Sequence, residues 1–231
     1  MVNLNPVPRP DRRRERTRTA LLEAGESLFA ARGAEGVTID EITAAADVAK
    51  GSFYNHFQDR DALAHEIYRL VRQSVEDQVD AANAGIADPA ARMARAGCVY
   101  AAFALRAPRR AGALLRLQVG KARREDALNR GVLADLEAGF ASGRFNGLSL
   151  EAALLLIFGV AQASLGRAID ADLPPITVET VADLHAGLLR GLGVAPADAL
   201  PIATAAARDL VAPITQAGPI TQVAPITRST P

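Results

Sequence analysis

The sequence predicts an all-α protein: a small three-helix domain at the N-terminus, a long connector helix and a C-terminal helical bundle. Two observations indicate this fold class. Hydrophobic residues make up 49% of the 231 residues but aromatic residues only 4%, so the apolar content rests on helix formers such as Ala and Leu. In addition, apolar residues recur three and four positions apart between recognisable helix caps.

Residues 1–14 are expected to form a flexible basic arm ahead of the first helix. Residues 1–20 hold six arginines against two acidic residues, a net charge of +4, and include three prolines. The whole chain is neutral, with 26 basic and 26 acidic residues, so this arm is a local concentration of charge. It is either a surface for an anionic partner or a solvated tail.

Residues 15–59 predict a helix-turn-helix unit. Thr38 and Glu41 have the spacing of a capping box, which opens a helix of about two turns. Phe53 and Phe57 lie four residues apart and therefore share the buried face of the next short helix. Two short helices joined by a tight turn form a helix-turn-helix. The expected helices of this unit run over residues 18–32, 38–46 and 49–57.

Residues 60–194 predict the connector helix and a bundle of five further helices. Asp59 is a good N-cap for the connector, and Pro89, Pro108 and the pair Pro174-Pro175 mark helix starts or stops. Short breaks between amphipathic segments are typical of a helical bundle. The expected helices run over residues 59–82, 88–107, 109–120, 125–142, 149–170 and 177–192.

Residues 195–231 are expected to be a largely disordered tail. Three hexapeptides that share the triplet Pro-Ile-Thr follow one another over residues 212–217, 218–223 and 224–229. Three copies with a proline in each are too few and too poor in hydrogen-bond donors for a stable solenoid.

The N-terminal motifs resemble the DNA-binding domain of the TetR family of bacterial transcriptional regulators over about residues 13–65. In the C-terminal half the resemblance amounts to helix number and length. It implies a dimeric, sequence-specific DNA-binding regulator, most often a repressor that a small-molecule effector releases from a palindromic operator. A regulator without an effector, acting as an activator or an architectural protein, is the alternative. The motifs are Leu21 to Ala24, Leu28-Phe29, Arg32-Gly33, Val37 to Ile42, Val48 to Phe57, Arg60 and Leu63.

The candidate DNA contacts lie on and around the second helix of the motif, which has one lysine and no acidic residue. Side chains near the start of such a helix read base edges, which points to Lys50, Ser52 and Asn55. By resemblance, Tyr54 and His56 would hold phosphates, although His56 could be a surface histidine without a role. The full candidate set is Arg18, Thr38, Ala49, Lys50, Gly51, Ser52, Tyr54, Asn55, His56 and Arg60.

Two positions depart from the usual pattern of the family. The turn has Asp47 where glycine is common, and Asp adopts the left-handed conformation less readily than Gly but better than most residues. Ala49 stands where Ser or Thr usually caps the second helix, which removes a cap worth about 1 kcal/mol.

Dimer formation is implied because one helix-turn-helix reads few base pairs. In the family the last two helices form a four-helix bundle with those of the partner. Small residues among large ones over residues 150–169 suit such close packing, although an intrachain core is the alternative. The candidate interface residues are Leu154, Phe158, Ala161, Leu165, Val181, Leu184 and Leu188.

The resemblance also implies an effector pocket inside the bundle. The candidate lining residues are Tyr68, Met93, Tyr100, Phe103, Gln118, Phe140, Phe158 and Gln162, each of which could instead be ordinary core. The few aromatic residues left for the bundle favour a small or aliphatic effector. Cys98 has apolar neighbours, so a buried, unreactive thiol is favoured over a redox sensor.

Other classes of function find little support in the sequence. It holds no HExxH, GxSxG or phosphate-loop motif, so we expect a protein that is not an enzyme. One cysteine and three histidines without ligand spacing give no expectation of a metal or a cofactor. The first residues lack the apolar segment of a signal peptide, and the longest apolar run is about half of what a bilayer needs, so we expect a cytoplasmic protein without a membrane partner.

Overall fold

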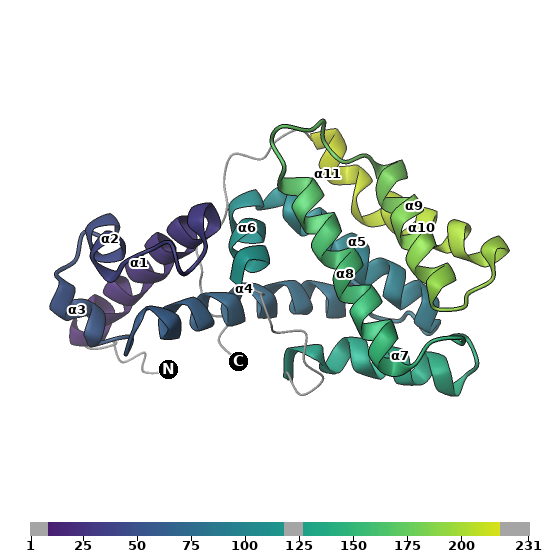
Figure 1. Cartoon of the computed structure of the whole chain (residues 1–231), viewed down its shortest axis with the longest axis horizontal. Helices are drawn as coiled ribbons and strands as arrows, with labels where there is room; N and C mark the ends of the chain where they lie inside the picture. Colours follow the sequence, from purple (N-terminus) through teal and green to yellow (C-terminus); the bar gives the residue numbers. More distant parts are fainter. Residues whose placement is uncertain (1–8, 118–126, 218–231) are drawn as a thin grey trace, which may run out of the picture.

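The computed structural model describes residues 9–117 and 127–217, and this part of the chain is all-α, as the sequence predicts (Figure 1). A small lobe holds α1, α2 and α3. The long helix α4 runs from this lobe into the larger lobe, where the remaining helices pack. The helices of the small lobe and the connector are α1 (Arg9–Arg32), α2 (Ile39–Ala45), α3 (Lys50–Tyr54) and α4 (Arg60–Ala82).

Helix α1 begins at Arg9, so residues 9–14 are helical and are not the flexible arm that the sequence predicts. Arginine is a good helix former, and this stretch holds no proline after Pro10, which lies in the first turn where its missing N–H costs little. The prediction of a flexible arm over residues 1–14 is therefore wrong for residues 9–14. Residues 1–8 lie outside the described residues.

The predicted helix-turn-helix is confirmed in its local chemistry. The Thr38 hydroxyl accepts a hydrogen bond from the Glu41 backbone N–H at 3.3 Å, and the Glu41 carboxylate accepts one from the Thr38 N–H at 2.8 Å. Asp47 in the turn has φ +53°, the left-handed conformation that this position requires. Phe53 and Phe57 are buried, at 0% and 6% exposure, and anchor α3 to the rest of the lobe.

The larger lobe follows the predicted order of helices with small shifts at the ends. The helix expected over 109–120 ends at residue 117 and residues 118–126 are not described, whereas the helix expected from 125 begins with a 3-10 turn. The elements are α5 (Pro89–Arg106), α6 (Pro108–Leu117), η1 (Ala127–Asn129), α7 (Arg130–Ala141), α8 (Leu150–Ile169) and α9 (Val178–Gly191).

The prediction that residues 195–231 are largely disordered is wrong for residues 196–217. Two more helices, α10 (Pro196–Leu210) and α11 (Ala212–Ala217), occupy this stretch, and α10 packs on α9 and α5. An interior proline, Pro201, removes one backbone hydrogen bond. The buried alanines Ala199, Ala203, Ala206 and Ala207 offset that cost because they permit close helix packing. The last two hexapeptides lie outside the described residues.

Two hydrophobic clusters fill the molecule. One is continuous from the small lobe into the larger one, since it joins Leu21 and Phe29 of α1 to Val71 of α4, Phe103 of α5 and Leu114 of α6. The other lies among α5, α7, α8, α9 and α10. The first cluster thus packs α4 and α6 against α1 of the small lobe.

Candidate nucleic-acid interface and internal cavity

Helix α3 presents a polar face at the end of the small lobe. Its buried side is Phe53, while Lys50, Tyr54 and Asn55 are exposed and Ser52 is half-buried. Tyr54 is 54% exposed, which is unusual for a large apolar ring in a folded chain and suits a surface that a partner covers. The N-cap residue Ala49 forms no side-chain hydrogen bond, so backbone N–H groups at the start of α3 keep their hydrogen-bonding capacity.

Lys50 forms an ion pair with Asp40 of α2, with 2.8 Å between Nζ and Oδ1. The hydrogen bond to Asp40 raises the pKa of Lys50, so the lysine is charged at neutral pH. Both side chains are largely exposed, at 56% and 70%, and an exposed pair of this kind contributes little to stability. Lys50 can therefore exchange Asp40 for an anion at small cost.

A second group of candidates lies at the N-terminus of α2. The Arg60 guanidinium donates to the backbone carbonyls of Glu35 and Val37, both at 3.4 Å, and Val37 precedes Thr38. Arg60 thereby brings a positive charge beside a helix N-terminus, where the helix dipole already favours anions. Thr38 is exposed beside it, with its hydroxyl engaged in the capping box.

Two of the remaining candidates, Arg18 and His56, have an internal partner or are half-buried, whereas Gly51 is exposed. Arg18 forms an ion pair with Glu66 of α4 at 2.5 Å and lies over the Phe57 ring, so its charge already ties α1 to α4. Burial, together with nearby Arg14 and Arg18, lowers the pKa of His56, which is therefore neutral at pH 7. Gly51 is exposed, and a Cβ there would meet no described atom within 4 Å.

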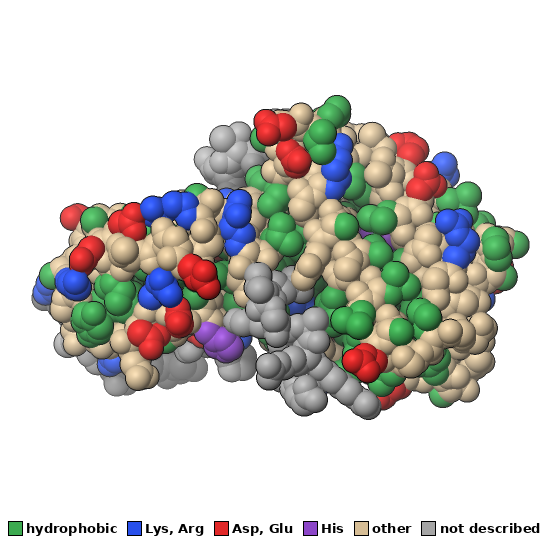
Figure 2. Space-filling model, viewed as in Figure 1, with side chains coloured by type: hydrophobic (Ala, Val, Ile, Leu, Met, Phe, Trp, Pro, Cys, Tyr) green, Lys and Arg blue, Asp and Glu red, His purple; other side chains and the backbone are tan. Residues whose placement is uncertain are grey.

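Figure 2 shows basic side chains distributed over the small lobe with acidic ones between them, so the lobe is not a uniform basic surface. Helices α2 and α3 lie at the end of the small lobe that is far from the bundle (Figure 1), and Lys50, Tyr54 and Asn55 are exposed there on α3 and its C-cap. Such a surface can hold phosphates at its edges and offer hydrogen-bonding groups to bases between them.

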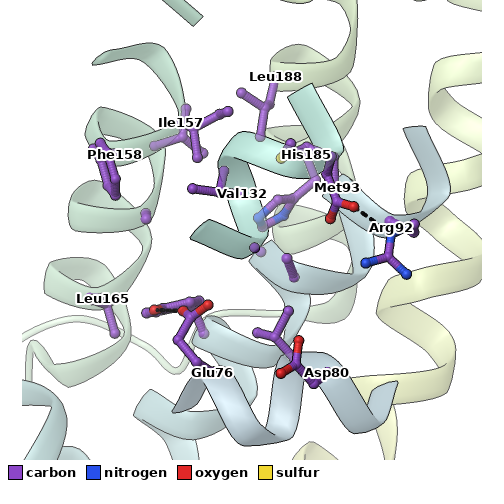
Figure 3. A pocket seen from close by; sticks show the side chains of 18 of the residues that line it. Glu76, Asp80, Arg92, Met93, Val132, Ile157, Phe158, Leu165, His185 and Leu188 are labelled. Atoms are coloured by element: carbon purple, nitrogen blue, oxygen red, sulfur yellow. Dashed lines mark hydrogen bonds and ion pairs between the residues drawn. The ribbon is translucent and has the colours of Figure 1, made fainter. Parts of the chain in front are cut away.

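The larger lobe encloses a small cavity of about 60 Å³, lined by α4, α5, α7, α8 and α9 (Figure 3). Apolar side chains of α8 and α9, among them Ile157, Phe158 and Leu188, lie toward one end of the view. Glu76 and Asp80 of α4 lie toward the other end, with the His185 ring between. The cavity thus has an apolar wall and an acidic floor.

Charged side chains inside this lobe form ion pairs and hydrogen bonds with one another and with neighbouring polar groups. Arg72 is 4% exposed, contacts Glu76 and Tyr100, and donates to Asn129 at 3.3 Å. The Tyr100 hydroxyl donates to Glu76 at 2.6 Å, and burial raises the pKa of Tyr100 to about 12. Buried charges in proteins are tolerated when they are paired in this way.

Three of the eight predicted pocket residues, Met93, Tyr100 and Phe158, line the cavity. Tyr68 and Phe103 are instead buried in the core that joins the two lobes. Phe140 packs edge-on against Phe145, with ring centroids 6.2 Å apart, and does not reach the cavity. Gln162 is exposed on the outside of α8, and Gln118 lies outside the described residues.

Sequence reasoning missed five charged lining residues and one neutral histidine: Arg72, Glu76, Asp80, Arg92, Asp135 and His185. A charged residue on an amphipathic helix is usually solvated, so the pattern gave no sign that these residues line a cavity. One signal was present: Arg72 and Glu76 are spaced i, i+4 among the apolar residues that face the bundle.

The predicted dimer residues are mostly inside the chain. Leu154, Phe158, Leu165, Val181 and Leu188 are buried at 8% exposure or less, and three of them line the cavity. Ala161 and Leu184 are half-buried. The apolar stripe indicated that α8 and α9 are buried, but it could not tell which side of each helix faces the chain's own core.

The outer side of α8 is apolar and uncovered in the single chain. Leu155 is 60% exposed, and Gly159, Gln162 and Ala163 are exposed on the same side. Green side chains gather over this part of the larger lobe in Figure 2. Among the described residues α8 alone has the length and apolar composition to cross a membrane, a test that core helices of soluble proteins also meet.

Cys98 is fully buried, and burial raises its pKa to about 12. A thiol with so high a pKa forms almost no thiolate at neutral pH. The structure therefore supports the unreactive reading of this residue over the redox-sensing one.

The fold and these surfaces define a two-lobed, all-α helix-turn-helix protein. Residues 21–67 match the family described as bacterial regulatory proteins, tetR family. This part of the chain thus matches the family that the sequence motifs indicated.

Curated relatives match in the same region. The repressor DhaR of Mycobacterium sp. (strain GP1) is 46% identical over 50 residues, which are 22% of this chain and 25% of that protein. The repressor KstR2 of Rhodococcus jostii (strain RHA1) is 40% identical over 52 residues, 22% of this chain and 26% of that one. The match spans about a quarter of the length of these relatives.

Solved structures extend the likeness to both lobes. RolR in complex with resorcinol is 28% identical, with a TM-score of 0.56 over 84% of this chain and 95% of that one. A putative tetR family transcription regulator from Shewanella sp. PV-4 has a TM-score of 0.69 at 17% identity, over 76% of this chain and 97% of that one. The larger lobe therefore has the fold of the corresponding lobe in these regulators.

Proposed function

We propose that this chain is a dimeric, sequence-specific transcriptional repressor that a small effector releases from a palindromic operator. The observation that carries the proposal is the exposed polar face of α3 on a lobe whose residues 21–67 match the TetR family. The curated relatives DhaR and KstR2 are named as transcriptional repressors. We extend this role to the present chain and propose that it acts as a repressor in the cytoplasm.

Base reading falls to Lys50, Ser52 and Asn55, while Tyr54, His56, Thr38 and Arg60 hold phosphates. Lys50 releases Asp40 on binding, which exchanges one exposed ion pair for another. His56 is neutral, so it contributes a hydrogen bond rather than a charge. Arg18 keeps its ion pair with Glu66 and supports the lobe from inside instead of contacting DNA.

The dimer forms through the outer side of α8 around Leu155, Gly159 and Ala163, together with the exposed side of α9. Glycine and alanine there let two helices approach closely, and a 60% exposed leucine gains burial from the partner. A second copy would thus cover the uncovered apolar face. Two helix-turn-helix units then read two half-sites one turn of DNA apart.

Coupling between cavity and DNA passes through α4 and α6. Helix α4 lines the cavity with Arg72 and Glu76, and two turns earlier packs Leu63 and Ile67 into the core of the small lobe. Helix α6 lies against α1, where Arg109 and Arg110 approach the buried carboxylate of Glu26 at 3.6 and 3.5 Å. A ligand that favours one position of α4 therefore shifts the reading helix as well.

The cavity is the effector site. RolR, which is similar to this chain over both lobes, has been solved with resorcinol bound, and this supports a small ligand here. The enclosed volume of about 60 Å³ points the same way, since it holds space for only a few water-sized groups.

The test is a footprint of the purified protein on DNA upstream of its own gene, repeated with candidate metabolites. We expect a protected two-fold symmetric site, and loss of protection with one small compound. Protection that no compound relieves would remove the effector from the proposal. Absence of protection at low salt by a folded protein would refute DNA binding, because electrostatic attraction to phosphate is strongest there.

A further inference from the structure

We infer that the cavity selects a small effector that donates hydrogen bonds, a neutral hydroxyl compound or an amine, and rejects carboxylates. The inference rests on the proposed effector role of this site and adds the chemical class of the ligand. It follows from which polar atoms facing the cavity are already engaged and which remain free.

The two cations of the cavity are engaged with groups of the protein. Arg72 contacts Glu76, Tyr100 and Asn129. Arg92 donates to Asp135 at 2.5 Å and to the backbone carbonyls of Asn83 and Ile86 at 3.2 and 3.4 Å. Each guanidinium is thus already paired with a carboxylate, Arg72 with Glu76 and Arg92 with Asp135, so an anionic ligand would compete with that carboxylate for the positive charge.

The cavity carries a net negative charge. Its lining holds two arginines against the three carboxylates Glu76, Asp80 and Asp135, a formal sum of −1. Two of these carboxylates are paired with the arginines and the third, Asp80, is exposed, so the described lining has no positive charge left over for an anionic ligand. A carboxylate or phosphate ligand is therefore disfavoured, and a neutral or cationic ligand is not.

Several of the atoms left free are acceptors. One oxygen of Glu76, Oε1, takes the hydroxyl of Tyr100, and one oxygen of Asp135, Oδ1, takes Arg92. The second oxygen of each carboxylate has no hydrogen bond from any described residue. Carboxylate oxygens can only accept, so they call for a ligand that donates.

His185 supplies an independent third acceptor. Its ring is 1% exposed, and Nδ1 lies 2.8 Å from the carbonyl of Val181, so Nδ1 carries the proton and Nε2 is an acceptor. Burial lowers the pKa of His185, which keeps the ring neutral. Nε2 forms no hydrogen bond with a described residue, and His185 lines the cavity together with Gly97, against which Nε2 packs. Its place exists only because residue 97 is a glycine, since a Cβ there would lie 2.0 Å from Nε2.

The ligand must also be small and partly apolar. The apolar side chains of Ile157, Phe158, Val132, Met93 and Leu188 also line the cavity, with Val132 and Met93 beside the His185 ring (Figure 3). A compact ring or a short chain with two hydrogen-bond donors suits such a lining. Its carbon atoms contact the apolar side chains, and its O–H or N–H groups donate to Glu76, Asp135 or His185.

The test measures binding to the DNA-free protein by titration calorimetry with matched trios of compounds of at most about twelve heavy atoms. One trio is 1,3-dihydroxybenzene, 1,3-dimethoxybenzene and benzene-1,3-dicarboxylate. A second is cyclohexane-1,3-diol with its dimethyl ether and the dicarboxylate, and benzylamine is the cationic arm. We expect donors to bind at least about tenfold more tightly than their ethers, because a hydrogen bond to a charged acceptor gives about that factor. Tighter binding of ethers or carboxylates, or binding of no donor compound, would overturn the inference.

A substitution in the cavity tests which carboxylate accepts the hydrogen bond of the ligand. Glu76→Gln replaces a carboxylate oxygen by a donor and should weaken the bound donors by about tenfold or more. The control Asp77→Asn lies on the same helix and is exposed, with Gln73 as its partner, and should leave binding unchanged. If Glu76→Gln does not fold, Asp135→Asn takes its place. These assays contain no DNA, so a protein that binds donors without leaving its operator would refute the proposed release and keep the ligand class.

Discussion

Replacing Gly97 by alanine tests the packing that places His185 in the cavity. A Cβ at residue 97 would lie 2.0 Å from Nε2 and 2.2 Å from Cδ2 of His185, whereas real contacts of this kind do not fall below 3.0 Å. The ring must therefore move by about 1 Å, but it is 1% exposed and Nδ1 is bonded to Val181 at 2.8 Å. Forcing extra atoms into a packed interior costs about 1–3 kcal/mol.

The matched control is Gly187→Ala on α9. Both glycines lie inside helices, so both variants gain up to about 1 kcal/mol of helix propensity. At residue 187 the new Cβ would meet only the end of Arg190, at 3.8 Å. The difference between the two variants isolates the clash, and we expect Gly97→Ala to be less stable than Gly187→Ala by about 1–3 kcal/mol.

The assay is chemical denaturation at one protein concentration, since the stability of a dimer depends on concentration. In thermal denaturation each kcal/mol should appear as about 2–4 °C in Tm for a chain of this size. The difference in stability between Gly97→Ala and Gly187→Ala should shrink when both carry His185→Ala as well, because the clashing ring is then absent. Equal stability of the two glycine variants would refute the placement of His185 against α5.

Four further predictions concern the reading helix, its caps and the cysteine. Lys50→Ala should change the preferred DNA sequence, whereas Tyr54→Ala should weaken binding at all sites alike. Binding curves on a set of operator variants measure both effects. If both substitutions weaken binding uniformly, the division between base and phosphate contacts is wrong. Ala49→Ser should restore the missing cap of α3 and raise the free energy of unfolding by about 1 kcal/mol, and a loss of stability on denaturation would count against the cap geometry. The hydrogen bond from the Thr38 backbone lowers the pKa of Glu41 to about 2. The stability that this carboxylate contributes is therefore complete above about pH 4.5 and is lost as the pH falls toward 2. The difference in free energy of unfolding between the native protein and Glu41→Gln should close over that range, and a constant difference would argue against an ionised cap. Cys98, with its pKa near 12, should resist iodoacetamide at pH 8 in the folded protein and react once it is unfolded, and fast labelling of the folded protein would contradict its burial.

Local chemistry was predictable from the sequence. The capping box of Thr38 and Glu41 and the left-handed turn residue Asp47 depend on short-range rules, and the structure shows both. The helix order to residue 192 was predictable for the same reason, because caps and prolines mark ends whatever the helices pack against.

Tertiary placement was not predictable in the same way. Helix α10 resembles a low-complexity segment in the sequence, since its buried face is made of alanine and a proline lies inside it. The cavity residue Arg72 is buried because Tyr100 and Asn129, which belong to other elements, satisfy its guanidinium, and no spacing within α4 reveals those two partners. For α8 the pattern gave an apolar helix, but which side meets the chain's own core depends on α5 and α9.

The most direct measurement for the central claim is selection of duplex DNA from a random pool by the purified full-length protein. The account predicts enrichment of a two-fold symmetric sequence whose half-sites lie about one helical turn apart, with affinity that falls steeply as salt rises. Enrichment of no sequence over the starting pool, by protein whose helical fold is intact, would contradict it.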